Sequence, residues 1–153
     1  MTLKEQIEKD VAVAMKNKER RLSILRMLRA ALQNAAIEKR TKVNDLKAEL
    51  DEKETLDIVR RQIKQLKESL QDFQKGNRPD LADKAKEELE TLEKYVPAAM
   101  PADELEKIVE ETIKELGATA PSDAGKVMGA VMKKVAGQAD GAAVKEMVSK
   151  NLL

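Results

Sequence analysis

Apolar residues recur every three or four positions along most of the chain, which is the spacing of α-helices. A capping box of Thr2 and Glu5 predicts the start of a first helix, and Asn17 predicts its end. A second helix is predicted over about Glu19–Arg40. Because its apolar face is wide, we expect this helix to be central and buried on more than one side.

The region from 41 to 50 is ambiguous, and Asn44 with Asp45 could cap a short helix there. A second capping box, Asp51 with Glu54, predicts the start of the third helix. This helix carries the clearest heptad stripe of the chain, formed by Leu56, Val59, Ile63, Leu66, Leu70 and Phe73. The stripe is under three heptads long, so we expect it to pack inside the monomer and not to form a long coiled coil.

The segment Lys75–Pro79 ends one helix and starts the next, so it predicts an antiparallel hairpin. The fourth helix is predicted to bury a stripe of Leu81, Ala85, Leu89, Leu92 and Val96. Pro97 and Pro101 then mark a domain boundary. We therefore predict an N-terminal helical domain over 1–96 and a small three-helix domain over 97–153.

Three shorter helices are predicted in the C-terminal domain. The first ends at Gly117, and Ser122 or Asp123 caps the second. The second ends at Gly137, and Asp140 caps the third. A unit of this size is small but can fold alone.

Composition supports the all-α prediction. Aromatic residues make up only 1% of the chain, while charged residues make up 37%. The core must therefore be built from aliphatic side chains and Met, which is typical of helices and not of strands. We expect an all-α protein with long antiparallel helices in its N-terminal domain.

The chain contains no Cys and no His, which excludes disulfides, thiol chemistry and the commonest metal ligand and general base. We expect no catalytic residue, no metal site and no cofactor. No apolar run approaches the length of a membrane span. The first residues lack a hydrophobic signal core. The plain expectation is a soluble cytoplasmic protein without a membrane partner.

The net charge of +1 conceals segregated blocks. Between Lys16 and Lys42 there are nine basic residues against Glu19 and Glu38, a local net of +7. Such blocks commonly pair with one another across neighbouring helices. The alternative is an anionic partner for this block, in which Arg26 and Arg29 flank the apolar face of the second helix.

The segment from Asp123 to Gly141 is the most unusual part of the chain, because it combines four glycines with three lysines in a helical context. Glycine inside a helix costs about 1 kcal/mol relative to alanine. Gly125 and Gly129 therefore predict a close approach to the helix backbone. Two readings remain open, namely tight packing of a second helix, or an anion site at an open helix start beside Lys126.

The chain resembles the YqeY family and the similar tail domain of the GatB subunit of the tRNA-dependent amidotransferase. The residues that carry the C-terminal resemblance are Gly125–Gly129, Met132–Lys134, Gly137, Ala139–Gly141, Val144, Val148 and Leu152. Those upstream are Leu25–Asn34, Gln71–Phe73, Arg78, Asp80, Leu81, Leu92, Tyr95 and Pro97. The resemblance covers nearly the whole chain and leaves no room for the catalytic body of GatB.

The resemblance implies a non-catalytic, tRNA- or RNA-binding accessory protein, with an amidotransferase or the aminoacyl-tRNA machinery as a further partner. The candidate contacts in the C-terminal domain are Gly125, Lys126, Gly129, Lys134, Gly137 and Gly141. Lys133 joins them on its charge alone. The near absence of aromatic rings favours recognition of shape and phosphates over base stacking.

Two other functions are weighed against RNA binding. The first is a protein–protein adaptor, for which Met128, Met132 and Met147 would supply a flexible apolar surface. The second is an amidotransferase activity, which the resemblance to GatB suggests by label. The sequence argues against it, because amide transfer from glutamine needs an activated nucleophile and no such arrangement is evident.

Overall fold

The computed structural model describes residues 1–98, 100–135, 138–139 and 141–152. All regular structure in these ranges is helical, which confirms the predicted fold class. The chain divides into two compact units, residues 1–96 and 97–153. Each unit has its own hydrophobic core.

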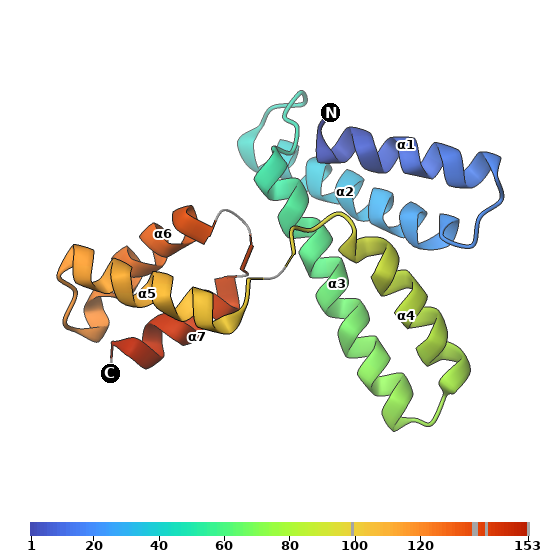
Figure 1. Ribbon diagram of the computed structural model, residues 1–153. Helices are drawn as coiled ribbons and strands as arrows, with labels where there is room; N and C mark the ends of the chain where they lie inside the picture. The colour runs from blue at the N-terminus through green and yellow to red at the C-terminus, as the bar shows by residue number, and fades with distance from the viewer. Residues whose placement is uncertain (99, 136–137, 140, 153) are drawn as a thin grey trace. The chain divides into compact units, whose positions relative to one another are not determined.

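The first unit contains four helices: α1 (Leu3–Lys16), α2 (Leu22–Val43), α3 (Glu52–Lys75) and α4 (Pro79–Glu93) (Figure 1). Both predicted capping boxes are present, at Thr2 for α1 and at Asp51 for α3. Their side chains accept hydrogen bonds from backbone N–H groups of the first turn, which otherwise have no partner within the helix. The predicted hairpin of α3 and α4 is confirmed, with Pro79 at the start of α4.

The bounds predicted for α2 were wrong at both ends. The helix begins at Leu22 and not at Glu19, because Lys18 adopts a positive φ of 54° and forms a turn. It continues to Val43, where Asn44 in a left-handed conformation closes it. Asn44 therefore ends a long helix, which resolves the ambiguous region from 41 to 50: no helix begins between Asp45 and Asp51.

The stripe predicted for α3 is shifted at its first turn. Thr55 and Ile58 are buried there, while Leu56 is only half-buried. The hydroxyl of Thr55 donates to the backbone carbonyl of Asp51 at 2.8 Å, so its burial leaves no polar group unsatisfied. A straight helix of 3.6 residues per turn drifts away from a strict seven-residue repeat, which accounts for the shift.

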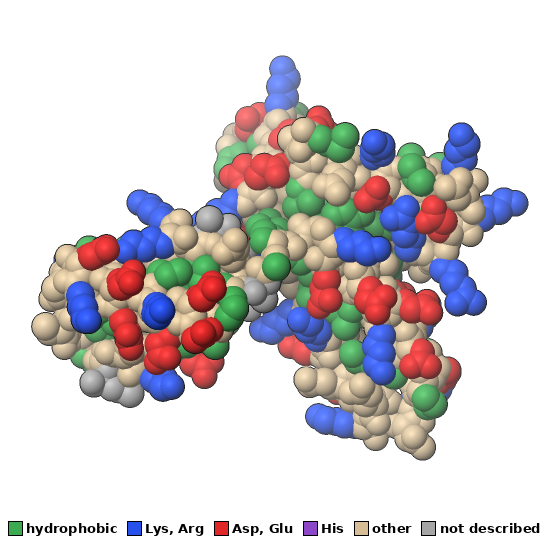
Figure 2. Space-filling view, in the orientation of Figure 1, with side chains coloured by type: hydrophobic (Ala, Val, Ile, Leu, Met, Phe, Trp, Pro, Cys, Tyr) green, Lys and Arg blue, Asp and Glu red, His purple; other side chains and the backbone are tan. Residues whose placement is uncertain are grey.

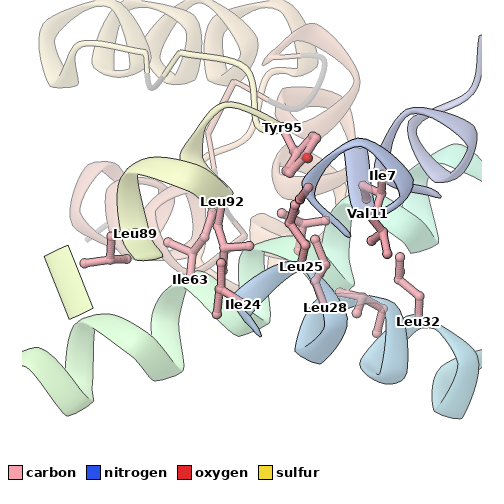
Figure 3. Packing of buried hydrophobic residues seen from close by; sticks show 13 residues of the cluster. Ile7, Val11, Ile24, Leu25, Leu28, Leu32, Ile63, Leu89, Leu92 and Tyr95 are labelled. Carbon is pink, nitrogen blue, oxygen red and sulfur yellow. The ribbon is translucent and has the colours of Figure 1, made fainter. Parts of the chain in front are cut away.

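The core of the first unit lies between all four helices. Figure 3 shows Leu25 and Leu28 of α2 beside Val11 of α1, with Leu92 of α4 and Ile63 of α3 further along. Tyr95 follows α4 and donates a hydrogen bond to the carboxylate of Asp10 in α1. Burial and this hydrogen bond raise the pKa of Tyr95 far above its usual range. The phenol thus stays neutral and holds the chain after α4 against α1.

The second unit contains α5 (Ala102–Leu116), a 3₁₀ turn η1 (Pro121–Asp123), α6 (Ala124–Val135) and α7 (Gly141–Asn151). Gly117 ends α5 as predicted, with a positive φ of 62°. The backbone N–H of Met100 donates to the carbonyl of Gln138 at 2.8 Å, which joins the start of the unit to the segment between α6 and α7. The predicted roles of Gly137 and Asp140 lie outside the described residues.

Candidate nucleic-acid interface

The start of α6 differs from the predicted cap. Asp123 directly precedes the helix, but its carboxylate accepts from the backbone N–H groups of Thr119 at 3.2 Å and Ala120 at 3.3 Å. It therefore closes the preceding turn and caps no first-turn N–H of α6 in the described structure. The first turn of α6 contains no acidic side chain. The partial positive charge of its N-terminus is thus not offset from within that turn.

Two faces of α6 have opposite character. Val127, Val131 and Val135 are fully buried in the core of the second unit. The opposite face is exposed and carries glycine and lysine, which we call the glycine–lysine face: Gly125, Lys126, Gly129 and Lys133. The spacing of 3.6 residues per turn brings these four residues to one side of the helix. The structure thereby assembles four of the predicted site residues.

The glycines of this face have no neighbour. Apart from its chain neighbours and the backbone of α6 itself, a Cβ atom added to Gly125 or Gly129 would meet no atom of the described residues within 4 Å. The interpretation of Gly125 and Gly129 as a tight helix-packing pair is therefore wrong within the described part of the second unit. The same space surrounds Gly141, the first residue of α7. The backbone of α6 is bare along this face and open to a partner.

The lysines of α6 fall into two groups. Lys134 donates to the carboxylate of Glu115 in α5 at 2.7 Å, so this candidate residue is engaged within the unit. Lys126 and Lys133 are exposed, and no ion pair joins either of them to a carboxylate of the described residues. No local pattern in the sequence separates Lys134 from Lys133, because the difference depends on the position of Glu115.

The basic block of the first unit is largely neutralised. Five of its nine basic residues form ion pairs, which are Arg20–Glu87, Arg21–Glu19, Arg29–Glu8, Lys39–Glu54 and Arg40–Glu49. Four of these carboxylates belong to other helices or to the segment before α3. Lys and Arg side chains stand beside Asp and Glu across the visible surface (Figure 2). Pairing between neighbouring helices thus describes this block better than a continuous cationic surface.

Arg26 and Arg29, the two candidates of the first unit, differ in environment. Arg26 is exposed and has no ion pair with a described carboxylate, while Arg29 lies 3.8 Å from Glu8 of α1. A surface cavity of about 570 Å³ lies beside α2 and α4 in this unit. Equal numbers of cationic and anionic side chains line it, so it shows no preference for an anion: Arg20, Arg21, Lys84, Glu87, Glu88 and Glu90.

The methionines proposed for an adaptor surface are part of the core. Met128, Met132 and Met147 are half-buried and pack against the apolar cluster of the second unit. Among the described residues of this unit, Leu116 is the one large apolar side chain that is strongly exposed. The exposed apolar patch that an adaptor would need is therefore absent from the described surface of this unit.

Two other kinds of feature, a metal site and a membrane-spanning helix, are not found among the described residues. No cluster of three or more carboxylates in the described ranges could hold a metal ion. None of the described helices combines the length and the apolarity needed to cross a membrane.

A comparison with family models matches residues 4–152 to the model described as Yqey-like protein. A comparison with curated proteins finds no match.

Proposed function

The chain belongs to the YqeY family, and on this premise we propose that it is a non-catalytic RNA-binding accessory protein with tRNA as its first ligand. The proposal assigns the contact to the glycine–lysine face of α6. The observation that supports it is the open space around Gly125 and Gly129, which lie beside Lys126 and Lys133, two lysines that form no ion pair with a described carboxylate. These glycines lower the stability of the helix without improving the packing of the described unit. Contact with a binding partner therefore explains their presence better than packing within the unit.

The face suits a phosphate backbone. Lys126 and Lys133 are seven residues apart, so their Cα atoms are separated by about 10.5 Å along the helix axis. The bare backbone of Gly125 and Gly129 lies at the same side, where a sugar–phosphate chain could approach to van der Waals distance. Contacts of this kind fix position and read shape, and they do not read base sequence.

Base stacking makes no contribution in this proposal. The two aromatic residues of the chain are Phe73 and Tyr95, and both belong to the first unit. The second unit therefore offers charge and shape alone. Shape-and-phosphate recognition is typical of proteins that bind structured RNA.

The charge of the face sets the expected salt dependence. Lys126 and Lys133 have no ion pair among the described residues, and Lys134 is held in an exposed one, so two or three phosphates would be neutralised. The logarithm of the affinity should then fall with the logarithm of salt concentration with a slope of about −2. An exposed ion pair such as Lys134–Glu115 is weak, so RNA could recruit this lysine at little cost.

Fluorescence anisotropy of labelled bulk tRNA at several salt concentrations tests the proposal. The variant Lys126→Glu/Lys133→Glu should lose binding. The matched control is Lys107→Glu/Lys114→Glu in α5, which changes the net charge equally at two exposed lysines with the same spacing. Equal loss in both variants would show a general charge effect and would remove the assignment to α6. No binding at low salt would overturn the proposed function itself.

A further inference from the structure

The outward side of α2 carries a continuous uncharged stripe. Its residues follow at steps of 4, 3, 4, 3 and 4, and all six are exposed: Ser23, Met27, Ala30, Asn34, Ile37 and Thr41. We call this the α2 stripe. It extends about 27 Å along the helix. Its two large apolar side chains, Met27 and Ile37, are 58% and 57% exposed. This alternation is the heptad spacing of a two-stranded coiled coil.

The stripe is uncharged although it lies within the most basic segment of the chain. Two of the cations that flank it are held by carboxylates of other elements: Arg29 pairs with Glu8 of α1, and Arg40 with Glu49 before α3. Arg26 is exposed and forms no ion pair with a described carboxylate. A phosphate backbone would meet no charge on the stripe itself and Arg26 alone as an exposed cation without a described ion pair close beside it. An apolar helix face fits it better.

We propose that the α2 stripes of two copies of this chain pair as a parallel coiled coil about a two-fold axis. In this arrangement Asn34, at an a position, would face Asn34 of the second copy. An amide both donates and accepts, so two identical amides satisfy each other. In the antiparallel alternative Asn34 would face Ala30, which offers no side-chain partner. An a-position Asn is the established means of fixing the register of coiled coils.

The flanking charges favour the same orientation. In a parallel pair, Gln33 of one copy lies opposite Glu38 of the other, and an amide can donate to a carboxylate. Arg26 lies opposite the small Ala31. In an antiparallel pair, Arg26 would instead lie opposite Arg40 of the other copy, and the two cations would repel.

The narrow stripe implies a weak dimer. One helix pair of this length buries less surface than interfaces of standard size, so we expect micromolar or weaker self-association. Protein concentration should therefore control the fraction of dimer. The association does not depend on the glycine–lysine face, and the two proposals stand or fall separately.

Sedimentation equilibrium of the full chain, from micromolar to millimolar concentration, tests the pairing. The average mass should rise toward that of a dimer. Ile37→Glu should weaken association at least tenfold. Val43→Glu, which changes an equally exposed apolar residue of α2 outside the stripe, should leave it unchanged. Circular dichroism verifies that both variants fold. A monomer at every concentration, or equal effects of both variants, would overturn the proposal.

The orientation has its own test, because the chain contains no Cys. Under mild oxidation Asn34→Cys should form a disulfide-linked dimer much faster than Lys42→Cys, which lies off the stripe. A mixture of Asn34→Cys and Ala30→Cys chains distinguishes the register. Faster cross-linking between the two different variants than within Asn34→Cys would show an antiparallel pair and refute the parallel arrangement.

Discussion

Replacing Gly129 by Ala is the sharpest test of how α6 is used. Gly129 lies in the interior of α6, and its Cβ would meet nothing within 4 Å. The new methyl group would add no clash, and the full difference in helix propensity should appear as stability. Glycine in a helix interior is about 1 kcal/mol less favourable than alanine. We therefore expect Gly129→Ala to stabilise the second unit by about 1 kcal/mol.

Thermal unfolding followed by circular dichroism can measure this gain. In a domain of 60–100 residues, 1 kcal/mol shifts Tm by about 4–8 °C. The reverse substitution in the same helix, Ala130→Gly, should lower Tm by at least as much, because the half-buried Ala130 also loses contacts. A fall in Tm of Gly129→Ala would refute the reasoning, since it would mean that another part of the protein contacts this glycine.

The same variant separates stability from binding. If the bare backbone is the contact surface for RNA, the added methyl group should weaken tRNA binding while it stabilises the free protein. Anisotropy should therefore show weaker tRNA binding by Gly129→Ala, whereas thermal unfolding should show a higher Tm. A variant that is more stable and binds tRNA with unchanged affinity would remove the glycines from the proposed interface.

Three further predictions concern polar contacts. Tyr95→Phe should lower the free energy of unfolding by about 1–2 kcal/mol, because the carboxylate of Asp10 loses a buried donor. Asp123→Ala should cost about 1 kcal/mol, since the backbone N–H groups of Thr119 and Ala120, just before η1, lose their acceptor. The hydrogen bond from Lys4 lowers the pKa of Glu49 in the folded protein below its usual value of 4.5. The ionised Glu49 therefore stabilises the folded state above pH 4.5, and this stabilisation is lost as the pH falls through the lower pKa of the folded state. Glu49→Gln should therefore reduce the acid sensitivity of urea unfolding.

Each of these has a result that contradicts it. Unchanged urea unfolding of Tyr95→Phe would mean that water replaces the phenol as donor to Asp10. For Asp123→Ala, a loss that Asp123→Asn restores would point to hydrogen bonding, and no loss at all would count against the turn as described. An acid profile of Glu49→Gln that follows the parent chain would show that this carboxylate contributes nothing to the loss of stability as the pH falls below about 4.5.

Local signals predicted most of the fold. Both capping boxes and the glycine after α5 appear where the sequence places them, because each acts over three or four residues of backbone. The start of α2 could not be predicted in this way. It depends on the positive φ of Lys18, and lysine is not a residue type that predicts this conformation. Tertiary packing between α1 and α2 selects it.

The candidate site was harder to predict than the fold. The glycines were visible in the sequence, but whether they face a helix or open space depends on which side of α6 the valines bury. Likewise, Lys133 and Lys134 are adjacent and identical in type. Only the position of Glu115 on α5 decides that Lys134 is paired. Such distinctions arise from contacts between residues far apart in the sequence.

The distribution of aromatic residues provides a built-in way to observe the two units separately. With no Trp in the chain, tyrosine emission comes from Tyr95 alone, and this residue is buried in the first unit. Far-ultraviolet circular dichroism, in contrast, reports the helices of both units. Comparing the two signals during one denaturation would resolve the unfolding of each unit without a label, and would show directly whether they melt together or in turn.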